Sequence, residues 1–377
     1  MTLSLIKDFE FKKKLTVNYT KIINYSLFKS ANLFDSQNDD ILYGGRLTGG
    51  KRFVVVDDYI FEHNKNKIIN YFKDRNIQAK IFSFCGAEEN KNFTSFFEIL
   101  KSLNDFQIDR RSEPIIAIGG GVTTDIAGFV ASVYRRGVPH IKIPTTLMCY
   151  VDASVGIKTG INYEDGKNRI GTFEPPVAVI LDKTFLKTLS KRHIVNGLGE
   201  IIKLGVVNDI RILELLEKNG ESAIKSGFQK DSDEILDISI VTMINELKPN
   251  LFEENLTRSV DFGHTFSPAL EMSALGNILH GEAVSIDVAL SILIARERGL
   301  VNESEFLRVI KIMKKLTLPY KHELLNVDIL WEGILERTYH RDGLQRIPLP
   351  NGLGQCLFIN DLTKKEINRA CILIREV

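Results

Sequence analysis

Hydrophobic residues in the first half of the chain alternate between short β-branched runs and stretches with helical spacing. Buried strands are predicted for RFVVVDD (52–58), QAKIFSF (78–84), EPIIAIGGG (113–121), IKIPTT (141–146) and VAVILD (177–182). Helical spacing occurs around residues 65–74 and in FTSFFEILKSL (93–103). Strands separated by helices predict a parallel sheet in an α/β layer architecture.

The pattern changes after about Leu186. Apolar residues then recur at three and four spacing in segments 188–218, 221–227, 232–248, 265–273, 279–298 and 303–316, with almost no strand-like runs. Residues 346–358 (RIPLPNGLGQCLF) resemble an irregular loop and a short strand. We therefore predict an α/β domain over residues 1–186 and a mainly helical domain over residues 187–377, with the boundary within residues 183–190.

Length, charge and cysteine usage narrow the class of protein. The 377 residues exceed the about 100–200 residues of one domain, which agrees with two domains. A formal net charge of +1 gives no general attraction to nucleic acid or to an anionic membrane. The four cysteines contain no CxxC pair and are not arranged as a disulfide framework. The first residues lack the apolar core of a signal peptide. No apolar stretch approaches the about 20 residues of a membrane span. These features predict a cytoplasmic protein.

A glycine-rich turn stands out in IIAIGGGVTTDIAGFVASVYRRG (115–137). A strand runs into three glycines (119–121), and a helix with Asp125 in its first turns follows. Such glycines let the backbone approach a ligand and adopt positive φ, and the helix N-terminus suits a phosphate. The spacing is not GxGxxG, so a turn without a ligand remains an alternative. Asp57, at the end of the first clear strand, is either a ribose ligand or an ordinary turn residue.

The segment 144–173 is dense in small and polar residues. Two lysines and an arginine there are suited to a phosphate ester, and Asn168 to a sugar hydroxyl. A solvated loop is the alternative, but glycines at 156, 160, 166 and 171 favour a shaped binding loop. The candidates are Asp152, Lys158, Lys167, Asn168 and Arg169.

Three residues are candidate metal ligands. His264 lies in FGHTF, His280 lies in ILHGEAV, and Glu200 lies in NGLGEIIKLG with Lys203 one turn further on. A Glu/His/His set with an open position is typical of catalytic zinc. HExxH is absent, so capping or core packing remains an alternative for each histidine, but the combination with Glu200 and the lysines favours a metal site.

In combination, the motifs resemble one known family. GGGVTTDIAG, RRG, PTTLMCYVDASVGIKTGIN, GKNRIGTF, GLGEIIKLG, DFGHTF and HGEAV, in this order over roughly residues 50–360, resemble the dehydroquinate synthase superfamily, the sugar phosphate cyclases. The resemblance implies an NAD-binding α/β domain, a helical domain, a divalent metal (Zn²⁺ or Co²⁺) and a homodimer.

The family's functional positions carry over motif by motif. The resemblance implies that the metal ligands are Glu200, His264 and His280. It implies substrate and catalytic positions at Asp152, Lys158, Lys167, Asn168, Lys203 and Lys248, with Arg136 as a phosphate contact. It places NAD near Asp57, Glu88, Lys91, Gly119, Gly120, Gly121, Asp125, Thr145 and Thr146.

Several departures bear on the substrate. Dehydroquinate synthases usually have Asn-Phe-Gly-His-Thr-x-Gly-His, with an arginine four residues before the asparagine. Here Asp261 replaces the asparagine, Ser267-Pro268 replaces Gly-His, and Thr257 replaces the arginine, with Arg258 next to it. Partners for the carboxylate of a 2-keto acid are therefore missing, and an unpaired buried charge is costly. HGEAV, where many relatives have HGHAV, has no explanation in the sequence.

The resemblance instead points to cyclases that act on sedoheptulose 7-phosphate. FGHTFSPALE and residues 340–367 are similar to these enzymes, and Leu247, Asp261 and His340 resemble the 2-epi-5-epi-valiolone synthase pattern. This implies catalytic positions at Asp261 and His340 and substrate contacts at Leu247 and Pro268. The implied reaction is transient oxidation by NAD, phosphate elimination, reduction and intramolecular aldol closure to a C7 cyclitol.

Alternative functions remain open. They are 3-dehydroquinate synthase, a relative making 2-epi-valiolone or desmethyl-4-deoxygadusol, an iron-dependent alcohol dehydrogenase, and a non-catalytic NAD-binding protein.

Overall fold

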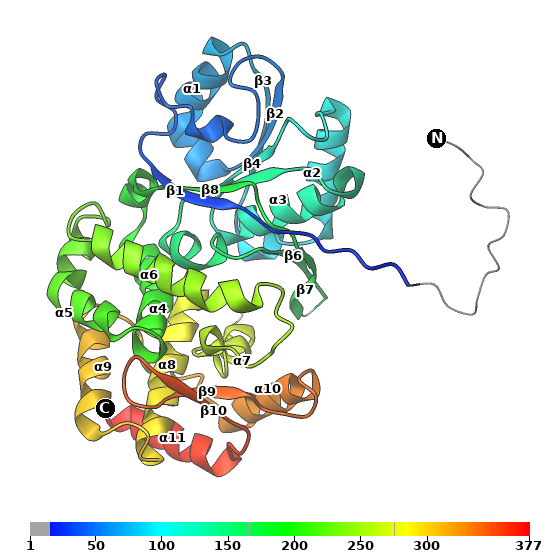
Figure 1. Ribbon diagram of the computed structural model, residues 1–377. Helices are drawn as coiled ribbons and strands as arrows, with labels where there is room; N and C mark the ends of the chain where they lie inside the picture. The colour runs from blue at the N-terminus through cyan, green and yellow to red at the C-terminus, as the bar shows by residue number, and fades with distance from the viewer. Residues whose placement is uncertain (1–15, 165, 275) are drawn as a thin grey trace, which may run out of the picture.

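The computed structural model describes residues 16–164, 166–274 and 276–377 (Figure 1). Residues 1–14, whose charged side chains argue against a signal peptide, lie outside the described residues. An α/β layer is followed along the chain by a mainly helical half, as the hydrophobic pattern predicts. Among the described residues, no helix is long and apolar enough to cross a membrane.

The N-terminal half is built on one six-stranded parallel sheet with the order β1-β8-β5-β4-β2-β3. All five predicted strands are present. The sixth, β1, was not predicted, because it is a half-buried edge strand with only a short apolar run. The bounds are β1 Ser26–Ser30, β2 Lys51–Asp57, β3 Gln78–Phe84, β4 Ile115–Gly119, β5 His140–Pro144 and β8 Ala178–Asp182.

Helices cover both faces of this sheet, which explains why its inner strands β2, β4, β5 and β8 are almost fully buried. Val54 and Val56 of β2 pack with α1 (Asp58–Asp74) on one face. Phe53 and Val55 face the other side, toward α2 (Phe93–Phe106) and α3 (Gly121–Val133). α3 starts at the carboxyl end of β4, so the glycine-rich turn lies at the edge where ligands bind in such folds.

The segment 144–173 differs from the predicted loop. It contains a π-helix, Cys149–Ala153, and an antiparallel hairpin of β6 (Lys158–Tyr163) and β7 (Gly166–Phe173). A Cβ at Gly160 would lie 2.6 Å from the Ile170 oxygen and 3.1 Å from the Gly171 Cα. Two of the four glycines therefore allow close strand pairing, a requirement that looks the same in sequence as a binding loop.

The C-terminal half contains α4–α11 and a short hairpin. The predicted helical stretch 188–218 is two helices, because the Asp209 side chain accepts from the Arg211 N–H and starts a new helix. The predicted loop and short strand at 346–358 are the two-stranded hairpin β9–β10, and α10 and α11 were not predicted. The bounds are α4 Lys191–Val207, α5 Ile210–Lys225, α6 Asp233–Leu247, α7 Ser267–Ser273, α8 His280–Glu297, α9 Glu303–Lys315, α10 Val327–Tyr339, α11 Lys364–Glu376, β9 Ile347–Pro350 and β10 Cys356–Ile359.

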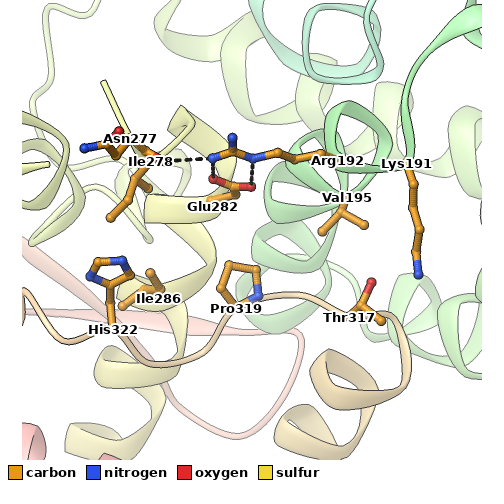
Figure 2. A pocket seen from close by; sticks show the side chains of 10 residues that line it. All are labelled: Lys191, Arg192, Val195, Asn277, Ile278, Glu282, Ile286, Thr317, Pro319 and His322. Atoms are coloured by element: carbon orange, nitrogen blue, oxygen red, sulfur yellow. Dashed lines mark hydrogen bonds and ion pairs between the residues drawn. The ribbon is translucent and has the colours of Figure 1, made fainter. Parts of the chain in front are cut away.

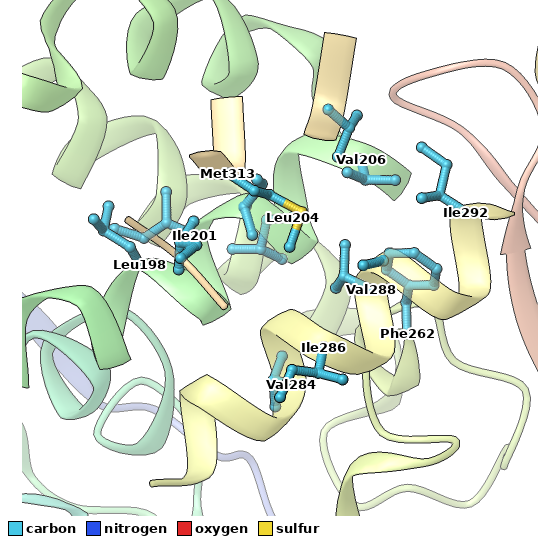
Figure 3. Close-up of a cluster of buried hydrophobic side chains, with 14 of the residues drawn as sticks. Leu198, Ile201, Leu204, Val206, Phe262, Val284, Ile286, Val288, Ile292 and Met313 are labelled. Atoms are coloured by element: carbon cyan, nitrogen blue, oxygen red, sulfur yellow. The ribbon is translucent and has the colours of Figure 1, made fainter. Parts of the chain in front are cut away.

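The crossing of α4 and α8 forms the centre of the helical half (Figure 3). Leu198 and Leu204 of α4 and Val284 and Val288 of α8 are fully buried in one core. The same core includes Tyr150, from the π-helix of the N-terminal half. One core therefore contains residues from both sides of the predicted boundary at 183–190. The boundary itself stays a prediction.

Candidate metal and substrate site

The α4–α8 crossing brings the three predicted metal ligands together. Candidate donor atoms of Glu200, His264 and His280 all lie within 4.8 Å of one another. His280 Nε2 is 3.2 Å and His264 Nε2 is 3.8 Å from Glu200 Oε1. Three residues separated by up to 80 positions therefore converge in one small cluster.

Glycines next to two of the ligands make this convergence possible. A Cβ at Gly199 would lie 2.8 Å from the Gly281 carbonyl carbon and closer still to its oxygen. The two backbones can approach this closely only because neither residue has a side chain. Gly199 directly precedes Glu200, and Gly281 directly follows His280. The close crossing therefore sets the distance between Glu200 and His280.

Each histidine has its second ring nitrogen engaged. His280 Nδ1 lies 2.9 Å from Glu271 Oε1, and His264 Nδ1 lies 3.2 Å from the Phe262 carbonyl oxygen. A proton on Nδ1 in both rings leaves both Nε2 atoms facing Glu200. Such outer bonds are typical of histidines that bind metals.

The ionisation of the cluster follows from burial and charge. Burial, with Lys203 next, lowers the pKa of His264 to about 3, which favours the neutral ring that a metal requires. Burial opposes the charge on His280, but Glu271 outweighs it and raises the pKa to about 10. The two carboxylates, Glu271 and Glu200, therefore favour positive charge at the His280 ring, where a divalent cation would compete with the proton.

Lys203 and Asp152 complete the charged surroundings. Lys203, one turn after Glu200, forms a buried ion pair with it. Burial alone lowers the pKa of Lys203, but Glu200 and Asp152 outweigh burial and raise it. Burial and the charge of Glu200 both raise the pKa of Asp152, so its carboxyl can hold a proton beside the cluster.

The residues fit a divalent cation. Glu200 is fully buried, and its two oxygens face Lys203 on one side and the Nε2 atoms of His264 and His280 on the other. A buried carboxylate needs positive charge beside it, and a divalent cation between Glu200 and the two imidazoles would supply it. Two imidazoles and one carboxylate are the ligand set of a catalytic zinc site with an open position.

The predicted NAD residues gather at the carboxyl edge of the sheet. The Asp57 carboxylate faces Gly86 after β3, and burial, followed by Asp58, raises its pKa. Thr145 extends β5 by donating to the Gly119 oxygen at 2.9 Å, and Thr146 accepts from the Cys149 N–H. Thr123 Oγ1 is buried there without a hydrogen-bond partner among the described residues.

The expectation of positive φ in the glycine turn was wrong. None of Gly119, Gly120 and Gly121 is in the left-handed region. Glycine is needed for space instead, because a Cβ at Gly119 would lie 2.6 Å from Thr123 Cβ. The turn is therefore tight for packing reasons, and it exposes the start of α3.

A buried lysine links the predicted NAD and substrate residues. Lys91 Nζ donates to Asp125 at 2.6 Å and to Asn168 Oδ1 at 2.5 Å. Glu88, also expected at the NAD site, is exposed and accepts from Asn162. Asn168, predicted to meet a sugar hydroxyl, is thus held by residues of the predicted NAD site.

Comparisons with known proteins agree with this geometry. A profile of the 3-dehydroquinate synthase N-terminal domain matches residues 81–196, and a profile of the 3-dehydroquinate synthase C-terminal domain matches residues 197–338. The chain belongs to the 3-dehydroquinate synthase family.

Particular relatives within this family differ in activity. The chain is 41% identical to a 2-epi-5-epi-valiolone synthase of Actinomyces sp., over 94% of this chain and 96% of that protein. It is 36% identical to a demethyl-4-deoxygadusol synthase of Trichormus variabilis, over 92% of this chain and 87% of that protein. The 2-epi-5-epi-valiolone synthase of Streptomyces hygroscopicus subsp. jinggangensis, solved with NAD⁺ and Zn²⁺ bound, superposes with a TM-score of 0.92 at 37% identity, over 96% of this chain and 99% of that chain.

Several residues implied by the family resemblance lie near the cluster. Lys167 Nζ is 2.7 Å from Glu271 Oε2, so one carboxylate contacts both this lysine and His280. Lys158, at the start of β6, pairs with Glu253 while most of its side chain stays exposed. Leu247, at the end of α6, lies 3.7 Å from where a Cβ of Gly156 would be.

Other expected site residues lie elsewhere in this chain. Arg136 is exposed and follows α3, whose 13 residues span about 20 Å, so it lies at the opposite end of that helix from the glycine turn. His340 is exposed at the end of α10, with its ring against Tyr339. Lys248 and Pro268 are also exposed. Within this chain Arg136 lies away from the glycine turn, and for all four residues a functional role remains a prediction.

Asp261 binds arginines that were not predicted. Arg341 Nη2 lies 2.6 Å and Arg337 Nη2 lies 3.2 Å from Asp261 Oδ2, and Arg258 Nη2 lies 2.5 Å from Oδ1. Burial opposes the charge on Asp261, but Arg258 and the other two arginines hold its pKa well below the usual range. Arg337 lies in α10, a helix that the sequence pattern did not predict, and Arg341 lies in the turn directly after it.

Two further carboxylates position the ligands. Asp287 of α8 accepts from the N–H groups of Phe266 and Ser267, which anchors the loop that carries His264. Glu271 holds His280. Asp287 lies in no motif that the sequence analysis singled out, and Glu271 is only the last residue of the run FGHTFSPALE. Neither residue can therefore be told from a surface acid by sequence alone.

The HGEAV departure also has a structural explanation. Glu282 accepts from the Leu279 N–H at 2.9 Å and pairs with Arg192 of α4 at 2.7 and 2.8 Å. It thus caps α8 directly after His280 and ties this helix to α4. The pair lines a cavity of about 480 Å³, shown in Figure 2, between α4, α8 and the segment after α9.

Proposed function

We propose that this protein is a sugar phosphate cyclase that converts sedoheptulose 7-phosphate into 2-epi-5-epi-valiolone and phosphate. The observation that carries the proposal is the cluster of a buried Glu200 with the half-buried His264 and His280, with Lys203 and Asp152 beside it. The 41% identity to a synthase of that name over nearly the whole chain supports the same substrate.

Two cofactors belong to the proposal. Glu200, His264 and His280 would hold Zn²⁺ or Co²⁺, and the edge formed by Asp57, the glycine turn and the N-terminus of α3 would hold NAD⁺. When bound, NAD⁺ supplies reversible hydride transfer and the metal acts as a Lewis acid.

The chain's own residues have separate tasks in this proposal. Lys203 keeps its positive charge at the cluster, where it favours negative charge developing on a substrate oxygen. Asp152 is suited to hold or release a proton, because burial raises its pKa. Lys158 and Lys167, with much of their side chains exposed on the β6–β7 hairpin, are suited to bind the phosphate.

The remaining expectations are part of the same proposal. We propose residues 1–186 as the NAD-binding domain and residues 187–377 as the metal-binding domain. A homodimer in the cytoplasm is the expected form.

Product identification tests the proposal. Sedoheptulose 7-phosphate, catalytic NAD⁺ and Zn²⁺ or Co²⁺ should give the cyclitol and free phosphate by NMR, without net NADH. The Glu200→Gln variant should lose turnover, while Glu217→Gln on α5, at a half-exposed ion pair with Arg308, should keep it. Full turnover without NAD⁺ and metal would contradict the proposal.

The alternatives give other outcomes in the same assay. Turnover only of a seven-carbon 2-keto-3-deoxy acid phosphate would indicate 3-dehydroquinate synthase. A different cyclitol from sedoheptulose 7-phosphate would indicate a relative making 2-epi-valiolone or desmethyl-4-deoxygadusol. Net NADH production would indicate an alcohol dehydrogenase.

A further inference from the structure

Three arginines converge on one buried carboxylate next to the metal cluster. Arg258 lies at the start of the short 3-10 helix that ends with Asp261, Arg337 lies in the last turn of α10, and Arg341 lies in the turn after α10. All three guanidinium groups lie within 3.2 Å of an Asp261 oxygen. Their side chains are only 13–15% exposed, and Asp261 is 10% exposed.

The charges of this group do not balance. Of the acidic side chains described, Glu253 is the only other carboxylate within ion-pair distance of these arginines; it contacts Arg258 and also pairs with Lys158. Arg337 Nε is buried and lacks a hydrogen-bond partner among the described residues. A site with this excess of buried donors is suited to bind an anion, because planar guanidinium groups match a carboxylate.

The group is directly connected to the metal cluster. Arg337 donates to the backbone oxygen of His264, and the His264 N–H donates to the backbone oxygen of Asp261 at 3.0 Å. An anion held by these arginines would therefore lie next to the substrate site. In this chain, Asp261 takes that place.

We propose that Arg258, Arg337 and Arg341 form a carboxylate-binding site and that Asp261 fills it from within the chain. With Asp261 in place, a carboxylate on an incoming substrate meets a negative charge and finds the guanidinium donors already used. Asp261 thereby determines the substrate class, a sugar phosphate with no carboxylate beside its ketone. This last consequence rests on the proposed function, whereas the filled anion site does not.

Chemical rescue tests the filled site without any turnover. Asp261→Ala removes the carboxylate and leaves room for formate, the smallest carboxylate. At constant ionic strength, formate should raise the unfolding midpoint of this variant saturably, by about 2 °C at ten times its Kd. Wild type should show no saturable rise. Glu217→Ala, which removes the carboxylate that pairs with Arg308 near the surface, should show none either.

Each outcome decides the matter. No formate effect on Asp261→Ala, or an equal effect on all three proteins, overturns the proposal. If Asp261→Ala folds only poorly, formate during refolding should restore the native circular dichroism spectrum, and its failure to do so also overturns the proposal.

A second measurement addresses the substrate class separately. A seven-carbon 2-keto-3-deoxy acid phosphate should bind Asp261→Ala with a Kd at least about tenfold lower than its Kd for wild type, measured by thermal stabilisation. The reason is that a bidentate arginine–carboxylate contact becomes available in the variant. Equal affinity would refute the role in specificity. Neither measurement depends on turnover of sedoheptulose 7-phosphate, so a failure of the proposed function remains distinguishable.

Discussion

Gly199→Ala is expected to weaken metal binding without touching a metal ligand. The added methyl group would lie 2.8 Å from the Gly281 carbonyl carbon, whereas carbon atoms pack best at about 3.5–4.0 Å. Because the obstacle is backbone rather than a movable side chain, α4 and α8 must separate by about 1 Å. Glu200 and His280, next to these glycines, then move apart as well.

The expected magnitudes follow from three contributions. Overpacking costs about 1–3 kcal/mol, and strain on the 2.7 Å bond from the Gly281 N–H to Asn196 Oδ1 costs up to about 1 kcal/mol. Alanine returns about 1 kcal/mol of helix propensity. The net loss of stability is about 2 kcal/mol, and a displacement of about 1 Å should weaken zinc binding about 10- to 100-fold.

Thermal unfolding of metal-free protein and chelator competition for Zn²⁺ measure the two effects. Gly333→Ala in α10 is the control, since its Cβ would meet only Ala269 Cβ, at 3.1 Å. The control should keep its zinc affinity and its unfolding midpoint. If Gly199→Ala behaves like Gly333→Ala in both assays, the close crossing does not set the ligand geometry.

Three other changes have defined outcomes. Glu271→Gln should weaken zinc binding about 10- to 100-fold in chelator competition, because it loosens the hold on His280 Nδ1; unchanged affinity would exclude this role. Asp287→Ala should cost about 2–4 kcal/mol in denaturant unfolding, because it orphans two buried N–H groups in the loop that carries His264; a loss below about 1 kcal/mol would contradict that anchoring. Lys91→Met should weaken NAD⁺ binding measured by calorimetry, since the half-buried Asp125 loses the lysine that pairs with it; equal affinity would remove Lys91 from the NAD site.

Some expectations failed because one pattern serves two purposes. Gly160 and Gly171 resemble a binding loop in sequence, yet they allow two strands to pair closely. Likewise, Gly119 is required by the space that Thr123 occupies and not by positive φ. A glycine in the sequence shows that a side chain is absent at that position. Only the neighbouring atoms in the structure show whether a ligand, a second strand or a packed side chain requires its absence.

The sequence by itself determined the α/β-then-helical order, the glycine turn at the end of β4 and the three candidate ligands, because periodicity and motifs are local. Only the tertiary structure decided how these parts meet. It placed Arg136 at the far end of α3, joined Glu271 to His280, and brought Arg337 and Arg341 to Asp261 across about 80 residues. Such contacts depend on how closely helices cross and on which buried charges must be paired, and no local pattern encodes either.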